Sequence, residues 1–139
     1  KPFVASHSNC RALTPHPRNL TDEMIRALAD CGGVIGVNFG PDFLEQGQPR
    51  FRKESRIAAI VAHLKHMIRI GGTDCAAIGT DFDGINGRLE IGSADRMPLL
   101  FEALEREGFA ADAIEKIAFR NVERVLREVL QAQNQKLQA

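Results

Sequence analysis

Side chains able to bind a metal or transfer a proton follow three short apolar runs in this 139-residue sequence. They are His7 after residues 2–6, Asn38 near the end of residues 33–39, and Asp81 with Asp83 after residues 75–80. A neutral imidazole and carboxylates are the ligands and acid–base groups that zinc-dependent hydrolysis requires. Each residue could instead end its strand by hydrogen-bonding to the backbone of a loop, as Asn and Asp commonly do. The residue types alone leave both interpretations open.

The three apolar runs must be positioned by the elements around them. Runs that are apolar on both faces and bounded by turn residues are typical of buried parallel strands. After the first run, Thr21 is expected to cap a helix that ends at residues 31–33. The buried stripe of that helix is predicted to be Met24, Ile25 and Leu28.

Helical spacing of apolar residues continues through the rest of the chain. One helix is predicted from Ser55 to Ile70, and another carries Leu99 to Leu104 and ends at Gly108. A short helix covers residues 111–118, and the last carries Val122, Val125, Leu126 and Val129. The element order is therefore β-α-β-α-β-α-α-α.

Strands that alternate with helices predict a parallel α/β fold with right-handed crossovers. Three strands are too few to close a barrel, which needs about eight. We therefore predict part of a (β/α)₈ TIM barrel, in which the strand ends that carry the polar residues meet at one rim. Residues 1–130 form its three βα units, and residues 131–139 form a polar, frayed tail.

Composition excludes several classes of protein. Eighteen basic residues balance eighteen acidic ones, so no net charge favours nucleic acid or an anionic membrane. The apolar runs are shorter than a membrane span, and no signal peptide is apparent at the start. The odd number of cysteines (Cys10, Cys31 and Cys75) predicts small buried thiols in a reducing compartment rather than disulfides. We expect a cytoplasmic protein.

Four ordered motifs resemble the membrane (renal) dipeptidase family of zinc metallopeptidases, and the similarity extends from about residue 2 to about residue 130. The motifs are residues 5–13 (ASHSNCRAL) with 16–20 (HPRNL), residues 32–39 (GGVIGVNF), residues 78–84 (IGTDFDG) and residues 121–126 (NVERVL). The resemblance implies the C-terminal part of a (β/α)₈ metallohydrolase that hydrolyses dipeptides with two zinc ions bridged by a glutamate.

The resemblance assigns a role to each matching residue. His7 matches the last zinc-ligand histidine, and Arg18 matches the arginine that binds the free carboxylate of the substrate. Asp81 matches the aspartate that takes part in proton transfer to the leaving amine. Asn38 and Phe43 are assigned to the substrate side, and Phe43 falls where mammalian relatives have a tyrosine, so that a hydroxyl contact is absent.

The same resemblance implies that most of the metal site precedes this sequence. The His-x-Asp pair, the bridging glutamate and another ligand histidine of the family have no counterpart here, which leaves His7 as the single ligand. Each zinc ion requires about four ligands. We therefore expect no dipeptidase activity from this chain alone. Its expected partners are a dipeptide and either the N-terminal half of the barrel or further copies of the chain.

Two other function classes compete with this hypothesis. The chain could be a non-catalytic half-barrel that serves as a scaffold or binding module, because an open sheet leaves unpaired edges. A phosphate-binding half-barrel is disfavoured, because the sequence has no glycine-rich phosphate loop. His63 and His66 are three residues apart and could bind a metal, but we expect them to be exposed helix residues. His16 could contribute to a substrate pocket.

Overall fold

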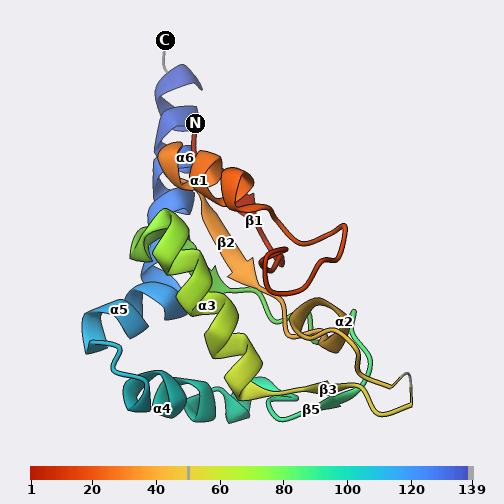
Figure 1. The fold of residues 1–139 in the computed structure, drawn as a ribbon. Coiled ribbons are helices and arrows are strands. Elements are labelled where there is room, and N and C mark those ends of the chain that lie inside the picture. The colour runs from red at the N-terminus through yellow and green to blue at the C-terminus, as the bar shows by residue number, and fades with distance from the viewer. Residues whose placement is uncertain (50, 138–139) are drawn as a thin grey trace.

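The computed structural model describes residues 1–49 and 51–137, with side chains described as far as residue 131. Figure 1 shows the strands beside a group of helices, with the last helix extending beyond them. The elements that the sequence predicted are β1 (Val4–Ala5), α1 (Asp22–Asp30), β2 (Val34–Val37), α3 (Ile57–Gly71), β4 (Ala76–Ile78), α4 (Pro98–Arg106), α5 (Ala111–Glu115) and α6 (Asn121–Leu137). The sequence did not predict α2 (Pro41–Leu44), β3 (Glu54–Ser55) or β5 (Arg88–Leu89).

The central sheet is parallel and has the order β1-β2-β4. Val4 pairs with Val34 and Ile35 pairs with Ala76, so the three strands lie side by side with their carboxyl ends at one edge. This confirms the predicted α/β class with three parallel strands and flanking helices. Among the described residues the outer edges of β1 and β4 have no strand neighbour. Two-residue β3 and β5 form a separate parallel pair.

Successive side chains of β2 point to opposite faces of the sheet and enter different clusters. Ile35 and Val37 pack in the main core with α1, α3 and α4. Val34 packs with Ala77 and Val125, and Val125 lies on α6. The sheet is therefore covered by α1 and α3 on one face, and by the start of α6 on part of the other.

Helix α1 begins as predicted. The hydroxyl of Thr21 accepts a hydrogen bond from the Met24 amide at 3.3 Å, which satisfies one of the unpaired N–H groups of the first turn. Ile25 and Leu28 are buried as expected, but Met24 is 48% exposed, which corrects the prediction for that residue. The apolar stripe of α1 is narrower than the sequence indicates.

Helix α3 contradicts the expectation for its two histidines. His63 is 1% exposed and His66 is 7% exposed, so both are buried. His63 lies between Ile60 and Met67 on the face that packs into the main core. The prediction of exposed histidines was wrong because the imidazoles find polar partners inside the protein. His66 contacts Asp22 through Nε2 at 2.7 Å.

A π-helical turn (Lys116–Arg120) joins α5 to α6, and two polar side chains attach α6 to the amino ends of the strands. Asn121 donates to the carbonyls of Thr73 and Ala76 at 2.8 Å each. Arg124 donates to the Gly32 carbonyl at 2.7 Å. These bonds satisfy backbone carbonyls at or shortly before the first residues of β2 and β4. They attach the first turn of α6 to that end of the sheet.

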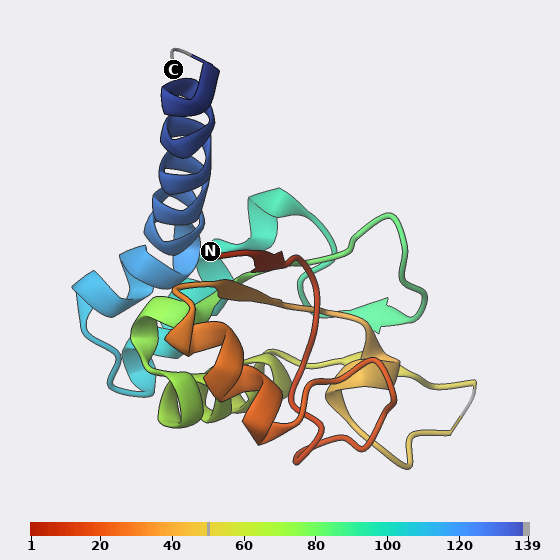
Figure 2. The ribbon, with the colours of Figure 1, turned by 90° about the horizontal axis from the view of Figure 1, so that it is seen from above.

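The outer part of α6 differs from the predicted stripe. Val125 is buried, whereas Leu126, Val129 and Leu130 are exposed, because α6 extends beyond the sheet (Figure 2). The backbone of the predicted tail is helical as far as Leu137, and residues 138–139 lie outside the described residues.

The cysteines are free thiols, as the sequence predicts. Cys10 and Cys75 are buried and Cys31 is half-buried. Burial raises the pKa of Cys10 to about 12 and that of Cys75 to about 11, which keeps both thiols protonated and unreactive. None of the described helices has the length and hydropathy needed to span a membrane.

Candidate active site

His7 is positioned by the way the chain leaves β1. The carbonyl oxygen of Ser6 lies directly over Gly36 of β2 and Gly79 after β4, and a Cβ atom at either glycine would collide with it. The backbone of Ser6 can therefore pass this close to β2 and to the end of β4 only because residues 36 and 79 are glycines. The Ser8 amide then donates to the Gly36 carbonyl at 2.8 Å, which places His7 at the carboxyl edge of the sheet.

The contact between Ser6 and His7 influences which ring nitrogen of His7 is available. The hydroxyl of Ser6 lies 2.7 Å from Nδ1 of His7. When Nδ1–H donates to this hydroxyl, the lone pair of Nε2 is left for another partner. Metal-binding histidines commonly donate their second N–H in this way. Half-buried His7 therefore has the chemistry of a single metal ligand.

Asp81 adopts a backbone conformation that is unusual for a residue with a side chain. Its φ angle is 61°, in the left-handed region, which costs roughly 1–2 kcal/mol in a typical residue and somewhat less in Asp or Asn. The Gly84 amide donates to the Asp81 carbonyl at 3.0 Å, and a Cβ at Gly84 would collide with the Asp81 carboxylate. The backbone of Asp81 therefore closes this turn, and Asp83, which the sequence grouped with Asp81, is exposed.

Asn38 holds the carboxylate of Asp81 in place. Its Nδ2 donates to Oδ2 of Asp81 at 3.0 Å, and its Oδ1 accepts from the Gly40 amide at 2.6 Å. The backbone of Asn38 is fixed by Asn9, whose side chain both accepts from the Asn38 amide and donates to its carbonyl. Asn38 is 1% exposed, so its bonds to Asn9 and Gly40 are buried, whereas its bond to half-buried Asp81 is partly buried. Asn38 therefore bonds both a loop backbone and a second site residue.

His7 and Asp81 line one open hollow of about 620 Å³ at the carboxyl end of the sheet. Its walls are Ser6, residues 78–80, Phe82, Ala94, Met97, Phe101 and Ala118. The hollow is thus mainly apolar, with an imidazole and a carboxylate on its surface. This is the place where parallel barrels carry their active sites. The predicted convergence of the strand ends is confirmed for His7 and Asp81, and for Asn38 through its bond to Asp81.

Arg18 and Phe43 form a second part of the site. The guanidinium carbon of Arg18 lies 4.9 Å from the centre of the Phe43 ring, within the range of a cation–π interaction. The His16 ring meets Phe43 edge-on at 4.8 Å, and its Nδ1 accepts from the Arg18 amide at 3.2 Å. Among the described residues no carboxylate pairs with Arg18, so its N–H groups face solvent.

Gly40 connects the two parts of the site. Its amide binds Asn38, and its carbonyl accepts a hydrogen bond from the Phe43 amide at 3.0 Å in the first turn of α2. A Cβ at Gly40 would press against both the Asn38 side chain and the Phe43 ring. Four of the five residues assigned to the site (Asp81, Asn38, Phe43 and Arg18) are therefore linked through the start of α2, which the sequence did not predict, and His7 joins them only by sharing the hollow with Asp81.

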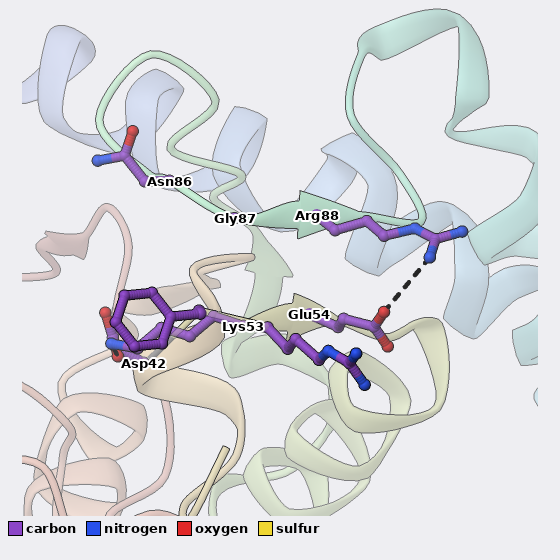
Figure 3. A pocket seen from close by; sticks show the side chains of 8 residues that line it. Asp42, Lys53, Glu54, Asn86, Gly87 and Arg88 are labelled. Carbon is purple, nitrogen blue, oxygen red and sulfur yellow. Dashed lines mark hydrogen bonds and ion pairs between the residues drawn. The ribbon is translucent and has the colours of Figure 1, made fainter. Parts of the chain in front are cut away.

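A second hollow, of about 660 Å³, lies beside the β3–β5 pair (Figure 3). Four of its charged side chains form two pairs: Lys53 binds Asp42, and Arg88 lies 3.5 Å from Glu54. Arg88 is exposed, and the picture shows it reaching along β5 toward Glu54. The first pair joins the segment before β3 to α2, and the second joins β5 to β3. The hollow contains none of the residues predicted for the site.

The described residues do not by themselves fit the two-zinc site that the resemblance implies. Among them no three His, Cys, Asp or Glu side chains lie close enough together to hold a metal ion. His7 offers one imidazole, whereas each zinc requires about four ligands.

The sequence did not predict a buried polar network at the carbonyls of Phe43 and Leu44. It comprises Thr14 and Asn19, from the loop between Asn9 and Leu20, and His63 of α3, all of which bond to the last carbonyls of α2. The sequence contained one signal for His63, which lies three residues after Ile60 and four before Met67, on the buried face of its helix. Nothing in the sequence marked α2 as the partner of Thr14 and Asn19.

Comparison with known proteins identifies the family. The sequence profile of the membrane dipeptidase family, peptidase family M19, matches residues 1–139. An uncharacterized protein from the pqqA 5′ region of Klebsiella pneumoniae is 44% identical over 130 residues, which cover 94% of this chain and 48% of that protein. A dipeptidase of Aspergillus terreus is 37% identical over 129 residues, covering 92% of this chain and 31% of the relative.

A solved structure gives the same result. A metallopeptidase from Rhodobacter sphaeroides, crystallised with a phosphinate mimic of the dipeptide L-Ala-D-Ala, superposes with a TM-score of 0.82 at 31% identity. The match covers 91% of this chain and 36% of that protein, so the chain spans less than half the length of each of these three relatives. Dipeptidases of this family are TIM-barrel metallohydrolases, which confirms the predicted part-barrel fold. The chain belongs to the membrane dipeptidase family, peptidase family M19.

Proposed function

We propose that this chain supplies the substrate-binding and proton-transfer side of the active site of a metal-dependent dipeptidase. The observation that carries the proposal is the bond from Asn38 to the Asp81 carboxylate, at the hollow that Asp81 shares with His7. A carboxylate held by a buried amide at the carboxyl ends of parallel strands is oriented for acid–base chemistry. Membership of the dipeptidase family supports a dipeptide as the substrate.

Arg18 is proposed to bind the free carboxylate of the dipeptide. The Phe43 ring supports the guanidinium group from one face, which leaves the N–H groups at its edge open for two parallel hydrogen bonds. This contact would hold the last peptide bond of the substrate, which in a dipeptide is the single one, at a fixed distance from Arg18. Phe43 supplies an apolar face and no hydroxyl group.

Asp81 is proposed to transfer the proton to the leaving amine. Hydrolysis of the peptide bond produces an amine that must be protonated as it leaves, and a carboxylate within reach can accept a proton from the attacking water and pass it to that amine. The carboxylate is preset by its Asn38 hydrogen bond and by the fixed turn to Gly84, so little reorientation is needed. Asp81 would thus act mainly on kcat.

A zinc pair, where bound, would supply the activated water. His7 is the residue of this chain proposed to act as a ligand. Since the described residues offer no complete site, the remaining ligands are proposed to come from a polypeptide segment beyond this sequence. The isolated chain is accordingly proposed to be inactive as a dipeptidase.

A binding module is the second candidate, and the exposed apolar face of α6 favours it. Leu126, Val129 and Leu130 lie on this helix with much of their surface in water. Apolar surface of this kind favours association. A chain that functions only by association would form stable oligomers and would tolerate replacement of Arg18 or Asp81.

One experiment separates the two candidates. The purified chain, of mass 15.3 kDa, is tested for zinc content, oligomeric state and hydrolysis of an alanine dipeptide. We expect no stoichiometric zinc pair and no hydrolysis from the chain alone. A preparation that also contains the complementary part of the barrel should bind the zinc pair and hydrolyse the dipeptide. A complemented, zinc-loaded preparation that does not hydrolyse dipeptides would leave the binding module as the better explanation.

A further inference from the structure

The loop that carries Arg18 is closed by its own backbone. The Arg11 amide donates to the Leu20 carbonyl and the Leu20 amide donates to the Asn9 carbonyl, each at 2.8 Å. These two bonds join the beginning of the loop to its end, so that it can move only as a unit. Its position relative to the rest of the site must therefore be set by contacts that the loop makes with other elements.

Asn9 attaches the base of the loop to Asn38, and the contacts made by the rest of the loop converge on the carboxyl end of α2. The last carbonyls of a helix have no partner within the helix. Here the Phe43 carbonyl accepts from Asn19 at 2.9 Å, and the Leu44 carbonyl accepts from the hydroxyl of Thr14 at 2.8 Å. Nε2 of His63 lies 3.0 Å from the same Leu44 carbonyl. Two loop side chains and one from α3 thus bind the helix that carries Phe43.

The two bonds of His63 determine its tautomer. Nδ1 accepts from the Cys10 amide at 3.0 Å, so it carries no hydrogen. A carbonyl oxygen can only accept, so Nε2 must carry the hydrogen and donate to Leu44. The ring is therefore the neutral Nε2–H form, and it joins the start of the loop to the end of α2.

The surroundings of His63 favour this neutral form. Burial lowers the pKa of His63, and the hydrogen bond to the Leu44 carbonyl opposes this in part. The nearby charged groups are His66 on the same helix, which lowers the pKa further, and Glu45 after α2, which raises it. A second proton would also remove the acceptor that the Cys10 amide needs. Protonation and an intact network are therefore incompatible.

We propose that neutral His63 is a positioning residue for the carboxylate-binding pair, Arg18 and Phe43. It holds the loop against α2 and thereby places Arg18 over Phe43. The role of this carboxylate-binding pair in binding a dipeptide rests on the proposed function. His63 itself does not touch the substrate site: it is 1% exposed and lies behind the loop. A buried, fully bonded polar network is well suited to define one arrangement of two surface elements.

The test compares matched variants of the 139-residue chain by NMR. Arg18 side-chain protons lie over the Phe43 ring and are therefore shifted by its ring current, with Phe43→Leu giving the unshifted reference. His63→Phe fills the buried space but removes both hydrogen bonds. His66→Phe is the matched control, since His66 is buried on the same helix and contacts Asp22 and Arg69 instead. His63→Gln restores one donor and one acceptor.

We expect His63→Phe to lose most of the ring-current shift of Arg18 while it stays folded. His66→Phe should keep the shift, and His63→Gln should recover part of it. A folded His63→Phe chain with the full shift would overturn the proposal. Equal loss in both phenylalanine variants would also overturn it, because the effect would then reflect general destabilisation of α3.

A measurement on the unaltered chain keeps the test decisive if His63→Phe fails to fold. Long-range ¹H–¹⁵N spectra distinguish the two neutral tautomers and the charged form of each histidine. His63 should show the Nε2–H tautomer near neutral pH. An Nδ1–H tautomer or a charged ring would refute the proposal, because neither can accept from Cys10. Neither measurement uses dipeptide hydrolysis, so this failure is distinguishable from failure of the proposed function.

Discussion

Replacing Asn38 by aspartate would put a second carboxylate against that of Asp81 in a buried position. In the native chain Nδ2 of Asn38 donates to Oδ2 of Asp81 at 3.0 Å. A hydrogen bond to a charged group contributes about 1.5–3 kcal/mol. The substitution would remove it and add like-charge repulsion, while the new carboxylate could still accept from Gly40. We expect Asn38→Asp to lower the free energy of unfolding by roughly 3 kcal/mol at about pH 8.

The pH dependence of this variant has a definite sign. Lowering the pH protonates one of the two carboxyl groups, which converts repulsion into a hydrogen bond between the introduced carboxyl group and that of Asp81. Stability lost at high pH is therefore regained as the pH falls, whereas acid commonly destabilises a protein whose carboxylates are paired. Urea unfolding at about pH 5 and about pH 8 measures the difference.

A double-mutant cycle isolates the interaction. Asp81→Asn keeps an acceptor for Asn38, and asparagine tolerates the φ angle of 61°, so its cost should be about 1 kcal/mol. The double variant N38D/D81N exchanges carboxylate and amide and remakes one charge-assisted bond. It should recover at least about 1.5 kcal/mol relative to Asn38→Asp. An Asn38→Asp chain as stable as the native one at about pH 8 would refute the reasoning, as would a double variant no more stable than Asn38→Asp.

Three further predictions follow from buried groups. Burial lowers the pKa of His63, so the buried ring should reduce stability only as the pH falls below 6.5, the ordinary pKa of histidine. Thermal unfolding of His63→Phe should lack that part of the acid sensitivity. Gly79→Ala should cost more than about 2 kcal/mol in urea unfolding, because the new methyl group collides with the Ser6 carbonyl, and an unchanged midpoint would contradict that close approach. In the folded chain a thiol reagent followed by mass spectrometry should modify Cys31 first, since burial raises the pKa of the other two thiols; early modification of either of those would contradict their burial.

The sequence predicted the elements with the strongest local patterns. The three strands are apolar runs that end at turns, and α1 begins at a capping threonine, so local chemistry was enough to locate them. The four-residue helix α2 was missed because it has no apolar period of its own. It is held by its contacts with Thr14, Asn19 and His63, which are distant in sequence.

The candidate site was predictable to a similar extent. Parallel strands bring their carboxyl ends together, so His7, Asn38 and Asp81 could be placed at one edge from their positions in the sequence. The left-handed backbone of Asp81 and the stacking of Arg18 on Phe43 were not predictable, because they depend on how loops pack. The place of His63 on the apolar face of α3 indicated burial, but its polar partners are backbone groups distant in sequence, which nothing in the sequence identified.

The central claim is that this chain carries two parts of a dipeptidase site: the carboxylate-binding pair, Arg18 and Phe43, and the proton-transfer group, Asp81. It is tested most directly by a chimera in which this chain replaces the matching segment of the metallopeptidase from Rhodobacter sphaeroides. The kinetics of dipeptide hydrolysis would be compared for the chimera and its Arg18→Ala and Asp81→Asn variants. We predict an active chimera in which Arg18→Ala mainly raises KM and Asp81→Asn mainly lowers kcat. A folded, metal-loaded chimera without activity would contradict the claim, as would variants that change KM and kcat alike.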